Sequence, residues 1–118
     1  MVMPTNTRMD RELKRGTLEM VLLQLLSERE MYGYEITAAL AERSAGAFDV
    51  KDGTLYPVLY RLEKADFVQP YWETPDRGVP RKYYRISAEG HTELARLRQE
   101  WDSFASAIQR LIQPGEGS

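Results

Sequence analysis

Apolar residues recur at helical spacing in three segments of the first half of the chain. Because residues three and four apart share one face of a helix, this spacing predicts three amphipathic helices. The second is expected to end near Glu42, and the third to run from about Asp52 to Asp66, with Asp52 or Thr54 as its N-cap. The spacing is carried by Leu18, Val21, Leu22, Leu25 and Leu26, then by Ile36, Ala39 and Leu40, then by Leu55, Val58, Leu59 and Leu62.

Two segments rich in aromatic and β-branched residues follow, Val68–Glu73 and Arg81–Ile86. The stretch between them holds two prolines and a glycine, which predicts a β-hairpin with a long tip. Ser87 is expected to cap a final helix that runs to about Ile112, and residues 113–118 are expected to be disordered.

Three helices followed by a hairpin is the order of a winged helix-turn-helix. The predicted fold is therefore mostly α with a β-hairpin wing. We assign residues 8–86 to a winged-helix DNA-binding domain and residues 87–112 to a C-terminal dimerisation helix.

Apolar residues in the final helix are spaced alternately three and four apart, which is typical of a helix–helix seam. This seam predicts a homodimer, although the same face could instead pack on its own domain. The first helix carries Met20 and Leu23 outside its main stripe, and Leu13 extends that second face, which suits contact with a partner's final helix. The seam residues are Leu94, Leu97, Trp101, Phe104, Ile108 and Leu111.

Composition narrows the function classes. The 118 residues include no cysteine and one histidine, so a thiolate or multi-histidine metal site within one chain is excluded. No paired carboxylates, glycine-rich phosphate loop or serine–histidine arrangement is present, so we expect neither an enzyme nor a cofactor. The chain lacks an apolar run long enough for a membrane span, and its start lacks the apolar core of a secretory signal. We therefore expect a cytoplasmic protein with no membrane contact.

The net charge is −2, but positive charge is concentrated in one segment. Residues 51–85 hold seven basic and five acidic side chains, and this segment contains the third helix and the hairpin. The predicted outer face of that helix presents Thr54, Tyr56 and Arg61, whose donors suit phosphates and base edges. At the hairpin tip, Arg77 and Gly78 suit the minor groove, because glycine permits close approach and arginine favours its negative potential.

Two tyrosines flank Gly33 at the start of the second helix. One of them is expected in the core and the other near a DNA phosphate, and we favour Tyr32 over Tyr34 as the outward one. Tyr71, Trp72, Tyr83 and Tyr84 in the hairpin are interpreted as packing residues.

Four motifs in this order resemble the signature of the PadR family of transcriptional regulators, from about residue 13 to residue 112. The motifs are Tyr32-Gly-Tyr-Glu-Ile36, Gly53-Thr-Leu-Tyr-Pro57, Arg61-Leu-Glu-Lys64 and Arg81-Lys-Tyr-Tyr-Arg85. The single C-terminal helix with a central tryptophan is similar to the small subfamily that includes multidrug-binding repressors.

The resemblance implies a dimeric repressor that releases DNA when it binds a small aromatic or hydrophobic compound. It places Tyr56 on the DNA and the wing residues Arg77, Gly78, Arg81 and Lys82 near the flanking minor groove. Many members place serine or proline before the Gly-Thr pair, where this chain has Lys51-Asp52. Lys51 adds a phosphate contact and Asp52 a repulsive charge. The effector-binding positions that the resemblance implies are Leu13, Met20, Leu23, Leu97, Trp101 and Ala105.

Two hypotheses about function follow. The first is a homodimeric repressor with two recognition helices about 34–36 Å apart, which would bind a pseudo-palindromic double-stranded operator. The alternative is a dimeric winged-helix adaptor that binds proteins without specific DNA binding, which the net negative charge favours. At the seam, Trp101 is either a packing residue or one wall of a slot for a flat aromatic ligand.

Overall fold

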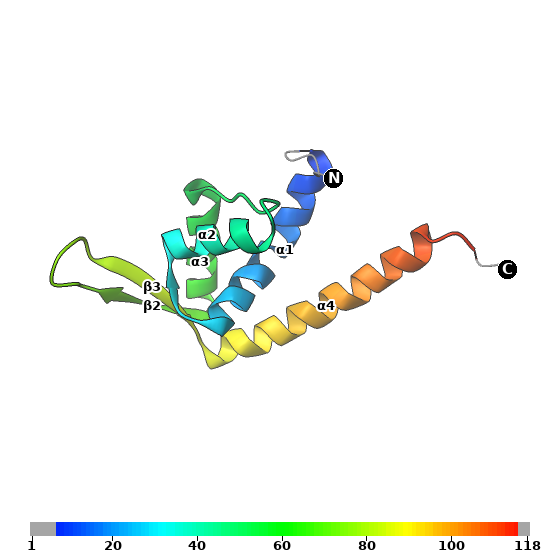
Figure 1. Cartoon of the computed structure of the whole chain (residues 1–118). Coiled ribbons are helices and arrows are strands. Elements are labelled where there is room, and N and C mark those ends of the chain that lie inside the picture. Colours follow the sequence, from blue (N-terminus) through cyan, green and yellow to red (C-terminus); the bar gives the residue numbers. More distant parts are fainter. Residues whose placement is uncertain (1–6, 116–118) are drawn as a thin grey trace.

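The computed structural model describes residues 7–115, which form four helices and a small sheet (Figure 1). Two terminal segments lie outside the described residues: 1–6 and 116–118. The first holds most of the start of the chain that was searched for a secretory signal, and the second belongs to the tail that was expected to be disordered. The elements are α1 Arg8–Glu28, β1 Met31–Tyr32, α2 Gly33–Arg43, α3 Asp52–Lys64, β2 Val68–Glu73, β3 Arg81–Ile86 and α4 Ala88–Ile112.

The sheet has three antiparallel strands in the order β1-β3-β2. Both hairpin strands have the predicted bounds, and Trp72 pairs with Lys82 in their register. The sequence analysis missed β1, a two-residue strand in which Met31 pairs with Tyr84 and Tyr32 with Tyr83. This strand joins the start of α2 directly to the wing.

The core lies between α1, α2, α3 and the inner face of the sheet. Leu22, Ile36, Leu55 and Leu59 are fully buried there, as their helical spacing predicts. Leu23 is also fully buried, so the expectation that it lies on a spare face of α1 is wrong. The sheet and α4 cover α1 from a further direction, and that contact takes up Leu23 within its own protomer.

The start of α4 is anchored to the same core. Leu94 is buried and Leu97 is half-buried against the core cluster, so the expectation that Leu94 belongs to an intermolecular seam is wrong. Ser87 is the N-cap, as predicted: its hydroxyl accepts from the Gly90 N–H at 2.9 Å. The same hydroxyl donates to the Asp66 carbonyl at 2.5 Å, and thus ties α4 to the turn after α3.

The free backbone groups at the two ends of α3 differ in their hydrogen bonds. Its N-cap is Lys51, and not Asp52 or Thr54 as predicted, and no side chain caps it. Pro57 lies in the second turn, where it leaves the Gly53 carbonyl without the usual helical donor. At the other end the Phe67 N–H donates to the Leu62 carbonyl at 2.9 Å, which turns the chain sharply into β2.

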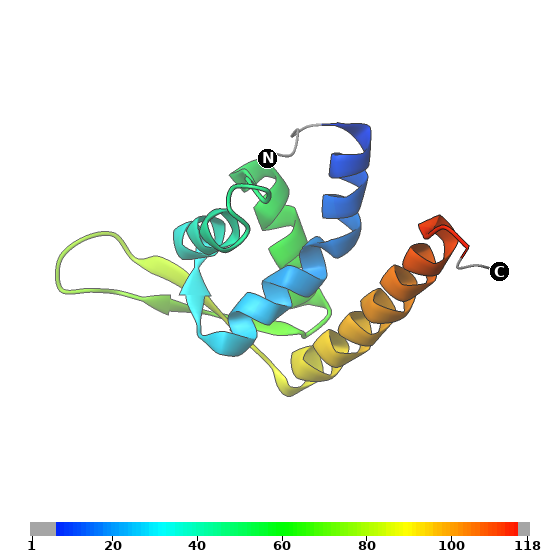
Figure 2. The same cartoon turned by 45° about the vertical axis from the view of Figure 1, so that its right-hand side comes forward.

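The molecule is elongated, with principal extents of 67 × 32 × 20 Å. The wing projects from one side of the helical body, and the distal half of α4 projects from the other (Figures 1 and 2). Among the described residues, no helix has the length and apolarity needed to cross a membrane. On the projecting half of α4, the apolar residues Phe104, Leu111 and Ile112 are exposed in the protomer.

We expect Ser87→Ala to lower the free energy of unfolding by about 1–2 kcal/mol, because it removes an N-cap and a buried bond to a backbone carbonyl. Urea unfolding measures this change. Ser103→Ala, on the exposed face of α4, is the matched control and should leave the midpoint unchanged. Equal midpoints for the two variants would contradict the role of Ser87.

Candidate nucleic-acid interface and apolar groove

The first turn of α2 and the middle of α3 meet at Gly33 and Tyr56. The Tyr56 ring lies directly against Gly33, where an added methyl group would overlap with the phenol hydroxyl and come within 2.9 Å of Cζ. Only glycine allows this approach. Tyr56 remains 45% exposed, so one edge of its ring is held by α2 while the other is available to a ligand. Two of the sequence motifs are therefore joined by one contact.

A buried tyrosine lies close to Tyr56. Tyr84 is 3% exposed beneath it, and burial, reinforced by nearby Tyr56 and Glu63, raises the pKa of Tyr84 to about 12. Tyr84 therefore stays neutral at physiological pH and serves as packing. For Tyr84, the interpretation as a packing residue is confirmed.

The outward tyrosine at the start of α2 is Tyr34, and not Tyr32 as favoured from the sequence. Tyr34 is 72% exposed, whereas Tyr32 is half-buried, with its ring edge-on to Tyr83 at 5.3 Å between centroids. The cause is β1, which brings Tyr32 opposite Tyr83 in the sheet. Tyr34 is thus the better-placed phosphate donor.

A ladder of rings and cations covers the outer face of the wing. Tyr83 stacks on Tyr71 at 5.5 Å, and the Arg81 and Arg85 guanidinium groups lie 4.7 and 4.8 Å from the Tyr32 and Tyr71 ring centroids. Tyr71 also donates to Glu30 at 2.5 Å, which raises its pKa to about 12. These contacts hold the wing in a fixed orientation relative to α2.

Three of the basic residues predicted to contact DNA form ion pairs. Arg61 pairs with Glu19 of α1 at 3.4 Å, Lys82 with Glu63 of α3 at 3.5 Å, and Lys51 with Asp49 at 3.4 Å. The Arg61 and Lys51 pairs are exposed, whereas Lys82 and Glu63 are half-buried. Exposed pairs contribute only about 0–1 kcal/mol, so an incoming phosphate can replace the carboxylate partner of Arg61 or Lys51. The pairs keep the side chains ordered near the surface formed by α3 and the wing.

The wing tip carries Arg77 and Gly78, both exposed. Gly78 has φ +106°, a conformation that other residues rarely adopt, so glycine is required by the turn itself. Arg77 precedes this turn at the far end of the hairpin, away from the α1–α4 side of the molecule (Figure 1). Thr54 lies exposed at the start of α3. The predicted nucleic-acid residues thus occupy α3, the start of α2 and the wing.

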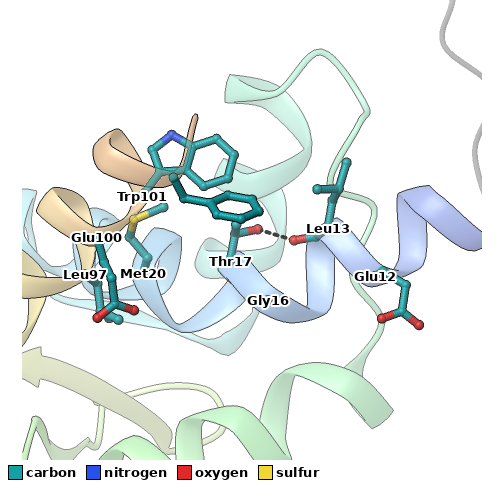
Figure 3. Close-up of a pocket in the computed structure, with 9 residues that line it drawn as sticks. Glu12, Leu13, Gly16, Thr17, Met20, Leu97, Glu100 and Trp101 are labelled. Atoms are coloured by element: carbon teal, nitrogen blue, oxygen red, sulfur yellow. Dashed lines mark hydrogen bonds between the residues drawn. The ribbon is translucent and has the colours of Figure 1, made fainter. Parts of the chain in front are cut away.

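An apolar groove of about 330 Å³ lies on the other side of the molecule, between α1 and α4 (Figure 3). Four of the predicted effector-binding residues line it: Leu13, Met20, Leu97 and Trp101. Two acids at its rim are paired, Glu12 with Arg15 at 3.3 Å and Glu100 with Arg96 at 2.6 Å. The groove therefore offers an apolar surface whose rim charges are locally compensated.

A second groove of about 370 Å³ reaches Phe48 and shares Leu13, Thr17, Met20 and Trp101 with the first. Trp101 thus lines both grooves, and its side chain is 40% exposed. Of the other predicted effector residues, Ala105 is half-buried one turn further along α4 and Leu23 is closed off in the core. Neither of them lines either groove.

Comparison with known proteins identifies the family. The model of the transcriptional regulator PadR-like family matches residues 22–96, more than half of the chain. The chain belongs to this family. A PadR family regulator from Eggerthella lenta has a structure with a TM-score of 0.81 at 33% identity, and the match covers 91% of each chain.

Two relatives extend the comparison to most of this PadR-like chain. An uncharacterized protein from Lysinibacillus sphaericus is 39% identical over 90 residues, which make up 76% of this chain and 83% of that protein. The transcriptional regulator Rv3488 of Mycobacterium tuberculosis is 28% identical over 98 residues, 83% of this chain and 88% of that protein.

Family membership makes the chain a DNA-binding transcriptional regulator with a winged-helix fold, and not an enzyme. The adaptor alternative is not favoured, because the matched proteins of known role are transcriptional regulators. The α3–wing surface is therefore the candidate DNA interface of this PadR-like regulator, and the α1–α4 groove is a separate site.

Two exposed aromatics near the candidate DNA interface were misassigned from the sequence. Trp72 was interpreted as a packing residue, yet it is 64% exposed on β2. Tyr34 was considered but not favoured, because the two-residue strand β1, which places Tyr32 opposite Tyr83, was not recognised. The signal for Trp72 was its position near the end of a wing strand, beyond the reach of the core.

We expect Gly33→Ala to destabilise the fold by about 1–3 kcal/mol, because the methyl group overlaps with the Tyr56 phenol. The double variant Gly33→Ala/Tyr56→Phe should recover part of this loss, since the hydroxyl is the atom that the methyl group meets first. Thermal unfolding of the four proteins in this cycle measures the coupling. Strictly additive effects would show that the two residues do not contact each other.

Proposed function

We propose that this PadR-like regulator is a homodimeric repressor whose DNA binding is released by a small planar aromatic or hydrophobic compound. The observation that carries the proposal is an exposed tryptophan that lines two neighbouring apolar grooves and lies on a helix whose distal half exposes a row of apolar side chains. DNA binding itself follows from the family, whereas the dimer, the ligand and the direction of control are proposed.

The support for a dimer is the distal half of α4. Phe104 is 58% exposed and Leu111 is 79% exposed, and Ile108 lies between them on the same helical face. A row of large apolar side chains on a projecting helix is stabilised when a second copy covers it. With Leu94 in its own core, the proposed seam begins at Leu97 and Trp101 and continues to the end of α4.

The support for a ligand site is the position of Trp101 within this seam. In a dimer, two copies of the indole and the two α1–α4 grooves would lie on the same interface. Flat rings stack favourably on indole faces, and a groove with a mainly apolar lining gives them a place out of water. Occupation of this site would favour one dimer arrangement and change the separation of the two α3 helices, on which binding to an operator with two half-sites depends.

The dimer is tested by static light scattering at micromolar concentration. The wild-type protein is expected at twice the 13.6 kDa mass of one chain, and Leu111→Glu, which introduces a charge into the proposed seam, is expected to scatter as a single chain with unchanged helicity. Gln109→Glu adds the same charge on the opposite face of α4 and should stay dimeric. A wild-type mass of one chain would overturn the proposed interface.

The ligand site is tested with Trp72→Phe, which leaves Trp101 as the single tryptophan. Titration with the planar dye acridine orange should quench its emission, and Trp101→Leu should weaken dye binding by about tenfold, because one stacking face is lost. If the dye leaves Trp101 emission unchanged and binds the leucine variant equally well, the proposed slot does not exist.

A further inference from the structure

Trp72 is the one large aromatic of the wing that its own fold leaves without a partner. Within residues 7–115, Tyr32, Tyr71 and Tyr83 take part in the outer ladder and Tyr84 is buried, but no ring or cation contact involves Trp72. Its side chain is 64% exposed at the distal end of β2. An indole left in water on a projecting hairpin suits contact with a molecule outside the protomer.

The strand register shows which way Trp72 faces. Residues paired directly across two strands point to the same side of a sheet, so Trp72 shares a face with Lys82. That face is turned toward α3, because Lys82 reaches Glu63 of α3 at 3.5 Å and Tyr84, two residues further along β3, is buried there. Trp72 therefore extends the α3 side of the wing beyond the core.

Like the adjoining face of the wing, the exposed surface of α3 carries an aromatic ring next to a lysine. Tyr60 is 59% exposed, and the Lys64 ammonium lies 5.7 Å from its ring centroid. On a helical projection both residues lie opposite the buried face of α3, with Tyr60 on the side nearer the wing. The outer face of α3 and the inner face of the wing thus alternate exposed rings with lysine ammonium groups.

We infer that Trp72 is a DNA-anchoring residue that lies against the sugar–phosphate strand between the groove read by α3 and the groove reached by the wing tip. The indole N–H is a donor only, which suits a phosphate oxygen, and its flat apolar face suits a deoxyribose. Lys82 beside it supplies the charge, and the interface is continuous with α3. The inference rests on DNA binding by this family and not on the proposed dimer or ligand release.

A DNA contact made by an uncharged side chain can be recognised from the salt dependence of the affinity. Each phosphate neutralised by a lysine or arginine releases counterions and makes affinity fall with salt, with a slope of about 0.9 per contact. A contact through an indole adds affinity but no counterion release. Loss of Trp72 should therefore lower affinity at every salt concentration without changing the slope, whereas loss of Lys82 should reduce the slope by about one.

The experiment uses a short duplex that the wild-type protein enriches from a random-sequence pool. We expect Trp72→Ala to bind this duplex about tenfold more weakly with an unchanged salt slope, and Trp72→Phe, which keeps a ring but loses the donor, to be intermediate. Gln69→Ala, an exposed neutral residue on the other face of the same strand, is the matched control and should bind like the wild type.

A second readout does not depend on a substitution at Trp72. Trp101→Phe leaves Trp72 as the single tryptophan, and its emission should be quenched at duplex concentrations that saturate this variant, with saturation measured by the anisotropy of a labelled duplex. Trp72→Ala binding within twofold of the wild type, or Trp72 emission that the duplex leaves unchanged, would overturn the inference alone. A wild-type protein that enriches no duplex would overturn DNA binding as well.

Discussion

The contact between Gly33 and Tyr56 is the constraint on which the geometry of the reading surface depends. The Tyr56 phenol packs on the Gly33 backbone with no room for a methyl group, and this joins the first turn of α2 to the middle of α3. The relative position of the two helices therefore depends on this contact. Because β1 precedes Gly33 directly and pairs with β3, the same contact also relates the wing to α3. This one close contact therefore relates all three parts of the candidate DNA interface to one another.

The chain carries a net negative charge, but its basic side chains are concentrated in the segment that forms α3 and the wing. This distribution allows the protein to approach the negatively charged DNA backbone. The net charge is −2, yet the basic residues of α3 and the wing are held at the surface by carboxylates and ring faces that can be exchanged for phosphate. Such weak local partners keep flexible side chains ordered without a large cost when they leave. Distribution, rather than total charge, is what suits this chain to its role as a DNA-binding regulator.

The sequence was sufficient for the hairpin and for the start of α4, because proline, glycine and Ser87 carry strong local signals. It was not sufficient for β1, since two residues cannot show a period, and the assignment of Tyr32 and Tyr34 failed with it. Leu23 and Leu94 were misplaced for a related reason: apolar spacing shows that a helix face is buried but not which neighbour buries it. The uncapped start of α3 had no signal of its own, because Lys51 is not a usual cap.

Most of the lining of the α1–α4 groove was predicted, but not all of it. Leu13, Met20, Leu97 and Trp101 line the groove as the family resemblance implies, whereas Ala105 does not, although its neighbour Phe104 does. The family positions thus locate the groove, but the face of each α4 residue decides which side chains enter it. For Trp72 the sequence suggested burial where the structure shows exposure. A tryptophan in a strand is usually packed, and only the three-dimensional extent of the core reveals that this one lies beyond it.

Ser87 connects three elements through its hydrogen bonds. One hydroxyl there serves the first turn of α4 and the carbonyl of Asp66 at once, while the Ser87 N–H donates to the Phe67 carbonyl. The long helix, the last wing strand and the bend that follows α3 are thus joined at one residue, because β3 ends at Ile86 and α4 begins at Ala88. With one residue between the two elements, a tilt of the far end of α4 would shift β3 and the end of α3, which belong to the candidate DNA interface.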